Sequence, residues 1–339
     1  MSAVTTGPDD VAALRGAVRA LLAKECPPAT VRAGWPGGDE TVVAALWRQF
    51  AVLGGTGVLV PETAGGIGLD ETFLVAVLEE TGYAALPAPV VESVAVAAPI
   101  LAAAGHADLL GALLDGSTVL SVVTDASAPV PYGQISDVVL VLAPDGTASL
   151  VRPGEREPIA SADGARRLAR LDLRGGRPVP VDPGVVATAR LRGVLGTAAE
   201  LVGLSRRMLD LTVSYVTERR QFGVPIGSLQ AIKHHLADVL LAVEFAAPMV
   251  ARAAGALAAG APEARRDVSA AKAIASESAR TVAGLTLQCH GAMAYTTEYD
   301  HHLFAKRAWA QAAAWGDAGH HRRVLAAELG LTREGDGHE

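Results

Sequence analysis

A basic and an amide side chain stand together at a predicted turn, where they could bind a phosphate group. Arg219 and Gln221 lie at the end of a predicted helix, and Gly223, Pro225 and Gly227 follow them. An arginine guanidinium donates two parallel hydrogen bonds to an oxyanion, and a side-chain amide donates another. The alternative is a surface arginine that interacts favourably with the carbonyl end of its helix. The turn is therefore a candidate anion site.

A second amide stands beside a glycine near the end of another predicted helix. Gln288 and Gly291 form a Gln-x-x-Gly pair, and Ala292 follows. The amide can donate to a ligand, and a glycine lets the backbone approach that ligand closely. A methyl group at Ala292 would crowd the same space.

Three pairs of adjacent histidines raise the question of a metal site. These pairs are His234-His235, His301-His302 and His320-His321. Adjacent residues on a helix point in different directions, whereas a metal ion needs ligands that converge. We therefore expect no metal site. Cys26 and Cys289 are far apart, which predicts neither a disulfide framework nor a zinc site and fits a reducing compartment.

Composition narrows the class of protein. The chain has 339 residues, half of them hydrophobic, which is enough for a sizeable core. The net charge of −7 and the lack of a basic run argue against nucleic-acid binding. The N-terminus resembles no signal peptide, and Pro99 and Gly105 interrupt the most apolar stretch. We expect a cytoplasmic protein without a membrane segment.

The pattern of residues divides the chain into helical and β-rich parts. We expect a helical domain at 1–116, a reduced β-domain at 117–183, a helical bundle at 184–332 and a tail at 333–339. Asp70 is a plausible N-cap. The predicted helices include 9–24, 40–53, 70–80, 185–220, 228–259, 263–291, 301–314 and 319–329.

Three short runs predict strands in the middle part. They cover 118–124, 138–142 and 149–152, and Asp145-Gly146 is a hairpin turn signal between the last two. The sequence therefore predicts a mostly α protein with a small β-domain in the middle.

The turn and its flanks closely resemble the signature of acyl-CoA dehydrogenases. Here the signature reads ERRQFGVPIGSLQ at 218–230, followed by His234, Leu236, Ala237 and Asp238. Two further segments agree in the same order, PE with GGIGL at 61–69 and QCHGAMAYTTEY at 288–299. The resemblance covers nearly the whole chain.

The resemblance implies a helical domain, a β-domain and a C-terminal four-helix bundle, assembled as dimers or tetramers. The family oxidises acyl-CoA thioesters to 2,3-enoyl-CoA with FAD: a carboxylate removes the α-proton, and the β-hydrogen leaves as hydride to the flavin. In the family, the arginine that matches Arg219 reaches across the dimer to the neighbour's FAD. Phe222 is either a flavin contact or a core residue, and Ala292 replaces a family glycine. The implied FAD contacts are Arg219, Gln221, Phe222, Leu229, Gln230, Gln288, Gly291 and Ala292.

The family's catalytic carboxylate has no counterpart in this chain. Its usual position falls on Trp315 or Gly316, and a second position, on the first bundle helix, falls near Gly193. Glu200 lies about two turns further along and should not reach the same spot. Asp317 is the nearest carboxylate, and burial could raise its pKa toward that of a base. A turn or N-cap role for Asp317 is favoured.

The β-domain departs from the family as well. Family members carry a Thr-Glu-Pro-x-Ala-Gly-Ser-Asp type segment that holds the flavin ring, whereas residues 124–132 read TDASAPVPY. The resemblance therefore implies the shorter, base-lacking subunit of an α2β2 enzyme, which completes the FAD site of a second acyl-CoA dehydrogenase subunit. A homo-oligomeric flavoenzyme that uses Asp317 as base, and a scaffold without flavin, stay open as alternatives.

Overall fold

Helices make up the N-terminal part, as the apolar periodicity predicts. The computed structural model describes residues 7–221 and 223–331. Asp70 accepts the N–H of Thr72 at 2.9 Å, so its predicted N-cap role is confirmed. Sequence patterns missed the short α2, whereas η3, α5 and α6 fall in the stretch between Pro89 and Leu114 where apolar helices are expected. The elements are α1 Pro8–Glu25, α2 Pro28–Ala33, α3 Glu40–Val52, η1 Gly55–Gly57, η2 Glu62–Ala64, α4 Glu71–Ala84, η3 Val91–Ala97, α5 Ala98–Ala103 and α6 Ala107–Leu114.

A small sheet follows, with strands in the order β1-β2-β3-β6. The strands β2 and β3 form the predicted hairpin, and Gly146 in its turn has a φ of 84°. β1 pairs with β2 in parallel, and β4 and β5 form a separate antiparallel pair. The strands are β1 Leu120–Val123, β2 Val138–Leu142, β3 Ala148–Val151, β4 Arg156–Pro158, β5 Ala169–Leu171 and β6 Arg177–Val179, with η4 at Gly164–Arg166.

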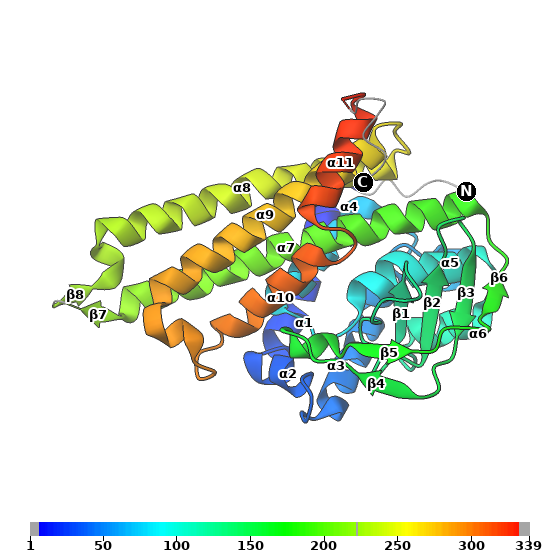
Figure 1. Cartoon of the computed structure of the whole chain (residues 1–339), viewed down its shortest axis with the longest axis horizontal. Helices are drawn as coiled ribbons and strands as arrows, with labels where there is room; N and C mark the ends of the chain where they lie inside the picture. Colours follow the sequence, from blue (N-terminus) through cyan, green and yellow to red (C-terminus); the bar gives the residue numbers. More distant parts are fainter. Residues whose placement is uncertain (1–6, 222, 332–339) are drawn as a thin grey trace.

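Long helices form the C-terminal part. Figure 1 shows α7, α8 and α9 running side by side as an arm, with β7 and β8 at its tip. The helical, β-rich, helical order is confirmed, and the predicted tail at 333–339 lies outside the described residues. The elements are α7 Pro183–Glu218, β7 Arg220–Gln221, β8 Val224–Pro225, η5 Ile226–Ser228, α8 Gln230–Ala258, α9 Ala264–His290, η6 Gly291–Tyr295, α10 His301–Ala313 and α11 Ala318–Glu328.

The helix α8 is long and apolar enough to cross a membrane by length and composition alone. In the fold it packs against α9 and α7, and 39% of its most apolar window is buried. The core helix of a globular bundle passes the same test, so this match assigns no membrane role. Its outer face keeps Leu240, Leu241 and Phe245 exposed to 48, 54 and 66%.

The backbones of α4 and α7 are in close contact. Because α7 is the first helix of the C-terminal part, this contact holds the two helical parts of the chain together. A Cβ added to Gly203 would lie 1.9 Å from the carbonyl oxygen of Glu79, and one added to Gly82 would lie 2.3 Å from that of Glu200. Both positions therefore exclude any side chain. The Glu79 carboxylate also accepts from Arg206 of α7 at 2.7 Å, so an ion pair reinforces the contact.

We expect Gly203→Ala to destabilise the fold by about 1–3 kcal/mol, because the added methyl group would overpack the α4–α7 contact. Gly284→Ala is the matched control, since a Cβ there meets nothing within 4 Å and alanine is the better helix former. Urea unfolding of both variants measures the difference. An unchanged free energy of unfolding for Gly203→Ala would contradict the tight contact.

Candidate functional site

The tip of the arm carries the residues predicted to contact a phosphate. Arg219 is the C-cap of α7, and Gln221 and Gln230 lie in the hairpin and at the start of α8. All three side chains are exposed, and so is Leu229, by 38%. Among the residues that the structure describes, no carboxylate lies within ion-pair distance of Arg219. Phe222 lies outside the described residues.

The Gln288–Ala292 segment lies at the same end of the arm. The helices α7 and α9 both finish there, and the Tyr215 hydroxyl donates to the His290 carbonyl at 3.4 Å. Gly291 has a φ of 59° and a ψ of −137°, which a residue with a side chain rarely adopts. Gln288, Gly291 and Ala292 are exposed. The fold thus brings together the two groups that the sequence singled out.

These groups have the chemistry that a nucleotide cofactor needs. The guanidinium of Arg219 can donate bidentately to a phosphate, and the amides of Gln221, Gln230 and Gln288 add neutral donors. Ala292, which follows Gly291, is exposed as well. These donors therefore suit the adenosine diphosphate half of FAD. The one departure from the family pattern at this site is Ala292, which stands in place of a glycine.

A different set of residues lies where the family would place its base. Trp315 has a φ of 56°, and its ring packs directly on α7. A Cβ added to Gly193 would lie 2.7 Å from that ring, so the glycine makes room for the indole. Trp315, Gly316 and Gly193 offer no carboxylate, and the indole of Trp315 occupies the space beside Gly193.

Only a small cavity remains beside Trp315. Its volume is about 170 Å³, whereas pockets for drug-sized ligands hold roughly 300–1,000 Å³. The segment that departs from the family's flavin-binding sequence forms one wall. A cavity of this volume lies below the range of pockets that hold drug-sized ligands. Its lining comprises Glu92, Val122, Val123, Thr124, Asp125, Ala128, Pro129, Pro131, Arg166, Ala314 and Trp315.

Buried polar groups hold the Trp315 loop in place. The Lys272 ammonium donates to the carbonyls of Ala312 and Gly316 at 3.1 and 3.0 Å and to the Ser276 hydroxyl at 2.9 Å. Burial lowers the pKa of Lys272 to about 7. The His321 ring lies 2.9 Å from the Trp315 carbonyl. These contacts stabilise a left-handed backbone that costs energy for a bulky residue.

Asp317 does not behave as a buried base. It caps α11 by accepting the N–H of His320 at 2.7 Å, and its side chain is exposed. This hydrogen bond lowers its pKa, opposite to the rise that the base hypothesis requires. Asp317 therefore acts as the N-cap of α11, which is the role that the sequence favours. Its exposed side chain lacks the burial that the base hypothesis requires.

Two carboxyl groups are buried in this part of the fold: Glu200, which the sequence analysis set aside as a base, and Glu92, which it did not consider. Glu200 accepts from Gln311 at 2.6 Å and from Thr81 at 3.3 Å, and burial raises its pKa to about 8. Glu92 lines the small cavity, and burial raises its pKa as well. Each acid is a single charged residue within an apolar run of sequence, and this pattern indicates a buried carboxyl group. Glu200 is bonded to Gln311 of α10, and the expectation that it does not reach the position of the base stays a prediction.

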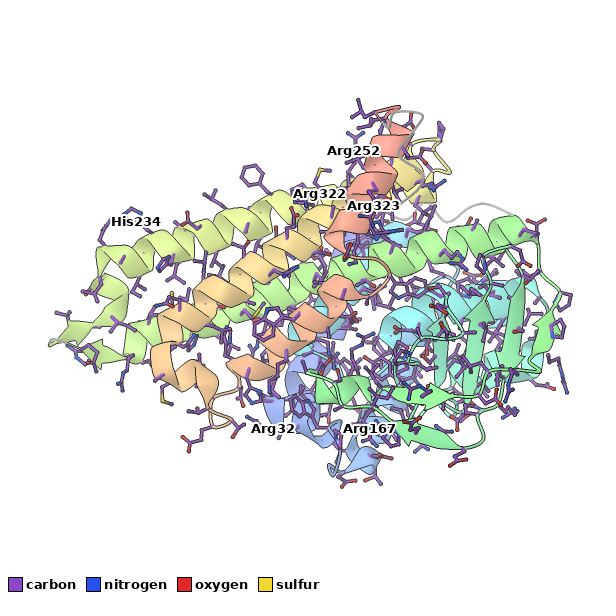
Figure 2. All side chains as sticks on the ribbon, in the orientation of Figure 1. Arg32, Arg167, His234, Arg252, Arg322 and Arg323 are labelled. Atoms are coloured by element: carbon purple, nitrogen blue, oxygen red, sulfur yellow. The ribbon has the colours of Figure 1, made fainter. Side chains whose placement is uncertain are left out.

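The histidine pairs scatter rather than converge. His234 projects outward from α8 (Figure 2), His301 is fully buried, and His320 is exposed. No group of three or more metal-ligating side chains occurs in residues 7–221 and 223–331.

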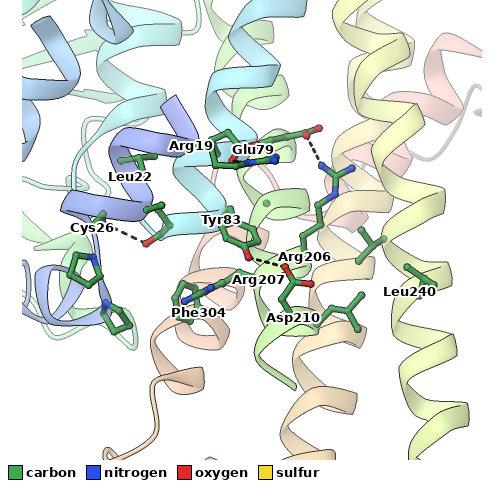
Figure 3. A pocket seen from close by; sticks show the side chains of 18 of the residues that line it. Arg19, Leu22, Cys26, Glu79, Tyr83, Arg206, Arg207, Asp210, Leu240 and Phe304 are labelled. Carbon is green, nitrogen blue, oxygen red and sulfur yellow. Dashed lines mark hydrogen bonds and ion pairs between the residues drawn. The ribbon is translucent and has the colours of Figure 1, made fainter. Parts of the chain in front are cut away.

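A second cavity, of about 690 Å³, lies between α1, α4, α7, α8 and α10 (Figure 3). Its polar groups pair with one another: Arg206 donates to Glu79 at 2.7 Å, and Tyr83 donates to Asp210 at 2.8 Å. These contacts pair several of the polar groups that line it. We assign it no part of the chemistry.

The arm tip and the Trp315 region cannot serve one ligand in the same chain. α7 is a continuous helix of 36 residues that carries Gly193 near one end and Arg219 at the other. At 1.5 Å per residue, the two positions lie about 39 Å apart along the helix axis. The donors at the tip therefore face away from their own chain.

Comparison with known proteins agrees with these motifs. The family model for the acyl-CoA dehydrogenase N-terminal domain matches residues 8–115, and the model for the C-terminal domain matches residues 186–330. The acyl-CoA dehydrogenase IpdE2 of Mycobacterium tuberculosis is 37% identical over 305 residues, which cover 89% of this chain and 92% of that protein.

Solved structures share the fold over nearly the whole length. The Tcur3481-Tcur3483 steroid ACAD variant is 27% identical, with a TM-score of 0.83, and the match covers 96% of this chain and 99% of that chain. The ChsE4-ChsE5 complex from Mycobacterium tuberculosis has a TM-score of 0.80 at 24% identity, over 98% of this chain and 100% of that chain, which shows the fold alone. On the family models and the IpdE2 match, this chain belongs to the acyl-CoA dehydrogenase family.

Proposed function

We propose that this chain is the non-catalytic subunit of a heteromeric acyl-CoA dehydrogenase. A second family subunit carries the base, and this chain completes that subunit's FAD site. The observation that carries the proposal is the separation along α7 between the exposed Arg219 and the Trp315 region. A donor set about 39 Å along α7 from the cavity beside Trp315 serves a ligand of a neighbouring molecule rather than that cavity.

The enzyme as a whole would dehydrogenate an acyl-CoA thioester at carbons 2 and 3. When bound, FAD supplies the hydride acceptor for this reaction. Arg219, Gln221, Gln230 and Gln288 of this chain would hold the cofactor's phosphate half, and Leu229, Gly291 and Ala292 would border it. Phe222 belongs to the same turn by sequence. The assembly would be a cytoplasmic α2β2 heterotetramer.

The small size of the cavity beside Trp315 also supports a non-catalytic role for this chain. Trp315 fills the space against Gly193, and the remaining 170 Å³ is too small for the flavin ring. The alternative in which Asp317 acts as base on its own flavin loses support, because Asp317 is an exposed N-cap.

The exposed face of α8 suits contact with a partner subunit. Leu240, Leu241 and Phe245 form an apolar patch on a helix whose first residues reach the proposed FAD site. Patches of this kind mark protein interfaces in soluble proteins.

Arg219→Leu should weaken FAD binding by the heteromer about tenfold or more, because it removes a charge-assisted bidentate contact. The measurement is the dissociation constant of FAD for the apo-heteromer, by flavin fluorescence. Arg323→Leu is the control, since Arg323 lies on α11, far from the tip (Figure 2). Equal FAD affinity in wild type and Arg219→Leu would refute the trans-completion role.

Trp315→Gly should open a ring-sized cavity and lower stability by about 3 kcal/mol, less any relief of backbone strain. Because the cavity matches the lost side chain, millimolar indole should raise the melting temperature of Trp315→Gly by mass action. Trp309→Ala removes an indole that is 43% exposed and should show no response to indole. A folded Trp315→Gly protein whose melting temperature ignores indole would show that the ring fills no such space.

Phe245→Glu should split the heteromer, because it buries a charge in the proposed apolar contact. Val52→Glu is the matched control on α3, where Val52 is 87% exposed. Light scattering after gel filtration reports the mass of each co-expressed pair. Full-size assemblies of both variants would rule out the α8 face as the subunit contact.

A further inference from the structure

The proposed FAD contacts of this chain come from two different helices. Arg219 follows the last residue of α7, whereas Gln288 lies in the last turn of α9 and Gly291 follows it. A binding constellation works only when its members are held to about 0.5 Å of their productive positions. Some contact must therefore fix the end of α7 relative to the end of α9.

Tyr215 and His290 provide that contact. Their rings stack with centroids 4.4 Å apart and an interplanar angle of 26°. The Tyr215 hydroxyl also donates to the His290 carbonyl at 3.4 Å, one of the carbonyls that a helix end leaves unpaired. Tyr215 stands one turn before Arg219, whose N–H donates to the Tyr215 carbonyl at 2.8 Å. The stack therefore connects Tyr215, one turn before Arg219, with His290, which directly precedes Gly291.

The hydrogen bonds of His290 show that its ring is a structural element rather than a ligand. Its Nδ1 lies 2.7 Å from the Thr286 carbonyl, which can only accept, so Nδ1 carries the proton. Its Nε2 is buried and has no hydrogen-bond partner among the described residues. Burial lowers the pKa of His290, which keeps the ring neutral. A buried ring facing tyrosines cannot itself reach a cofactor.

Tyr299 closes the cluster from the turn before α10. Its ring centroid lies 4.9 Å from that of His290 and 5.5 Å from that of Tyr215. Its hydroxyl donates to the Leu211 carbonyl at 3.3 Å, one turn before Tyr215. Tyr215, His290 and Tyr299 thus form an aromatic clamp that ties α7, α9 and the segment before α10 together at the arm tip.

We propose that the aromatic clamp is the positioning unit of the FAD-completing face. It touches no cofactor and acts through Arg219 and the Gln288–Ala292 segment, by fixing the spacing between them. The inference rests on the proposed function, because it needs Arg219 to serve a neighbour's FAD.

The test compares Tyr215→Leu with Tyr215→Phe in the co-expressed heteromer. Tyr215→Leu removes the stack and should weaken FAD binding about tenfold, whereas Tyr215→Phe keeps the ring and should stay within about threefold of wild type. In an Arg219→Leu background, Tyr215→Leu should add little further loss. This non-additivity distinguishes positioning from a general loss of stability, whose effects would add.

Tyr83→Leu is the matched control. Tyr83 is another half-buried tyrosine, on α4, whose hydroxyl donates to Asp210 of α7, five residues before Tyr215 and outside the aromatic clamp. It should leave the FAD dissociation constant unchanged. If the Tyr215→Leu heteromer cannot be recovered, Tyr299→Leu removes the same clamp from outside α7, with the same expected result.

Three results separate the outcomes. Unchanged FAD affinity in Tyr215→Leu, or in Tyr299→Leu where that variant replaces it, overturns the clamp. Fully additive losses with Arg219→Leu overturn it as well, and leave only a structural role for the rings. If Arg219→Leu alone has no effect, the proposed function fails, whatever the clamp variants do.

Discussion

The continuity of α7 is the constraint on which the rest of the structure depends. A single helix of 36 residues runs from the edge of the sheet to the tip of the arm. Its backbone hydrogen bonds fix the distance between its two ends, because an unbroken α-helix neither stretches nor folds back. Contacts without room for a side chain, at Gly193 and Gly203, lock the part of α7 before Arg206 against the body of the protein. The remainder of the helix, with Arg219, must therefore project away.

The two ends of α7 have opposite characters. At one end, Trp315 packs on the helix, and Lys272 and His321 hold its loop by the backbone carbonyls. At the other end, Arg219, Gln221 and Gln288 stand exposed with no side-chain partner among the described residues, and Gln230 contacts only His234 of its own helix. An enzyme that worked alone would need an open cavity beside its own base. A subunit that completes a neighbour needs the reverse arrangement, with a closed interior and an open tip.

Much of the fold could be predicted from the sequence, because helical periodicity and capping residues are local signals. Asp70 and Asp317 act as N-caps, and Gly146 turns the hairpin as its type predicts. The three-residue strands β4, β5 and β6 could not be predicted, since pairing with distant strands, and not their own residues, makes them strands. The sequence shows that Trp315 and Gly193 stand where the family resemblance implies a carboxylate. The packing of the indole against Gly193 could not be predicted, because only the fold brings the two together.

The number of flavins in the purified heteromer tests the central claim most directly. Native mass spectrometry of the co-expressed assembly, compared with this chain expressed alone, counts the cofactors bound to each. One FAD for each pair of subunits, with none on this chain alone, is the result that the account predicts. One FAD for every subunit, or a flavin held by this chain alone, would contradict it, because this chain would then have a complete flavin site of its own.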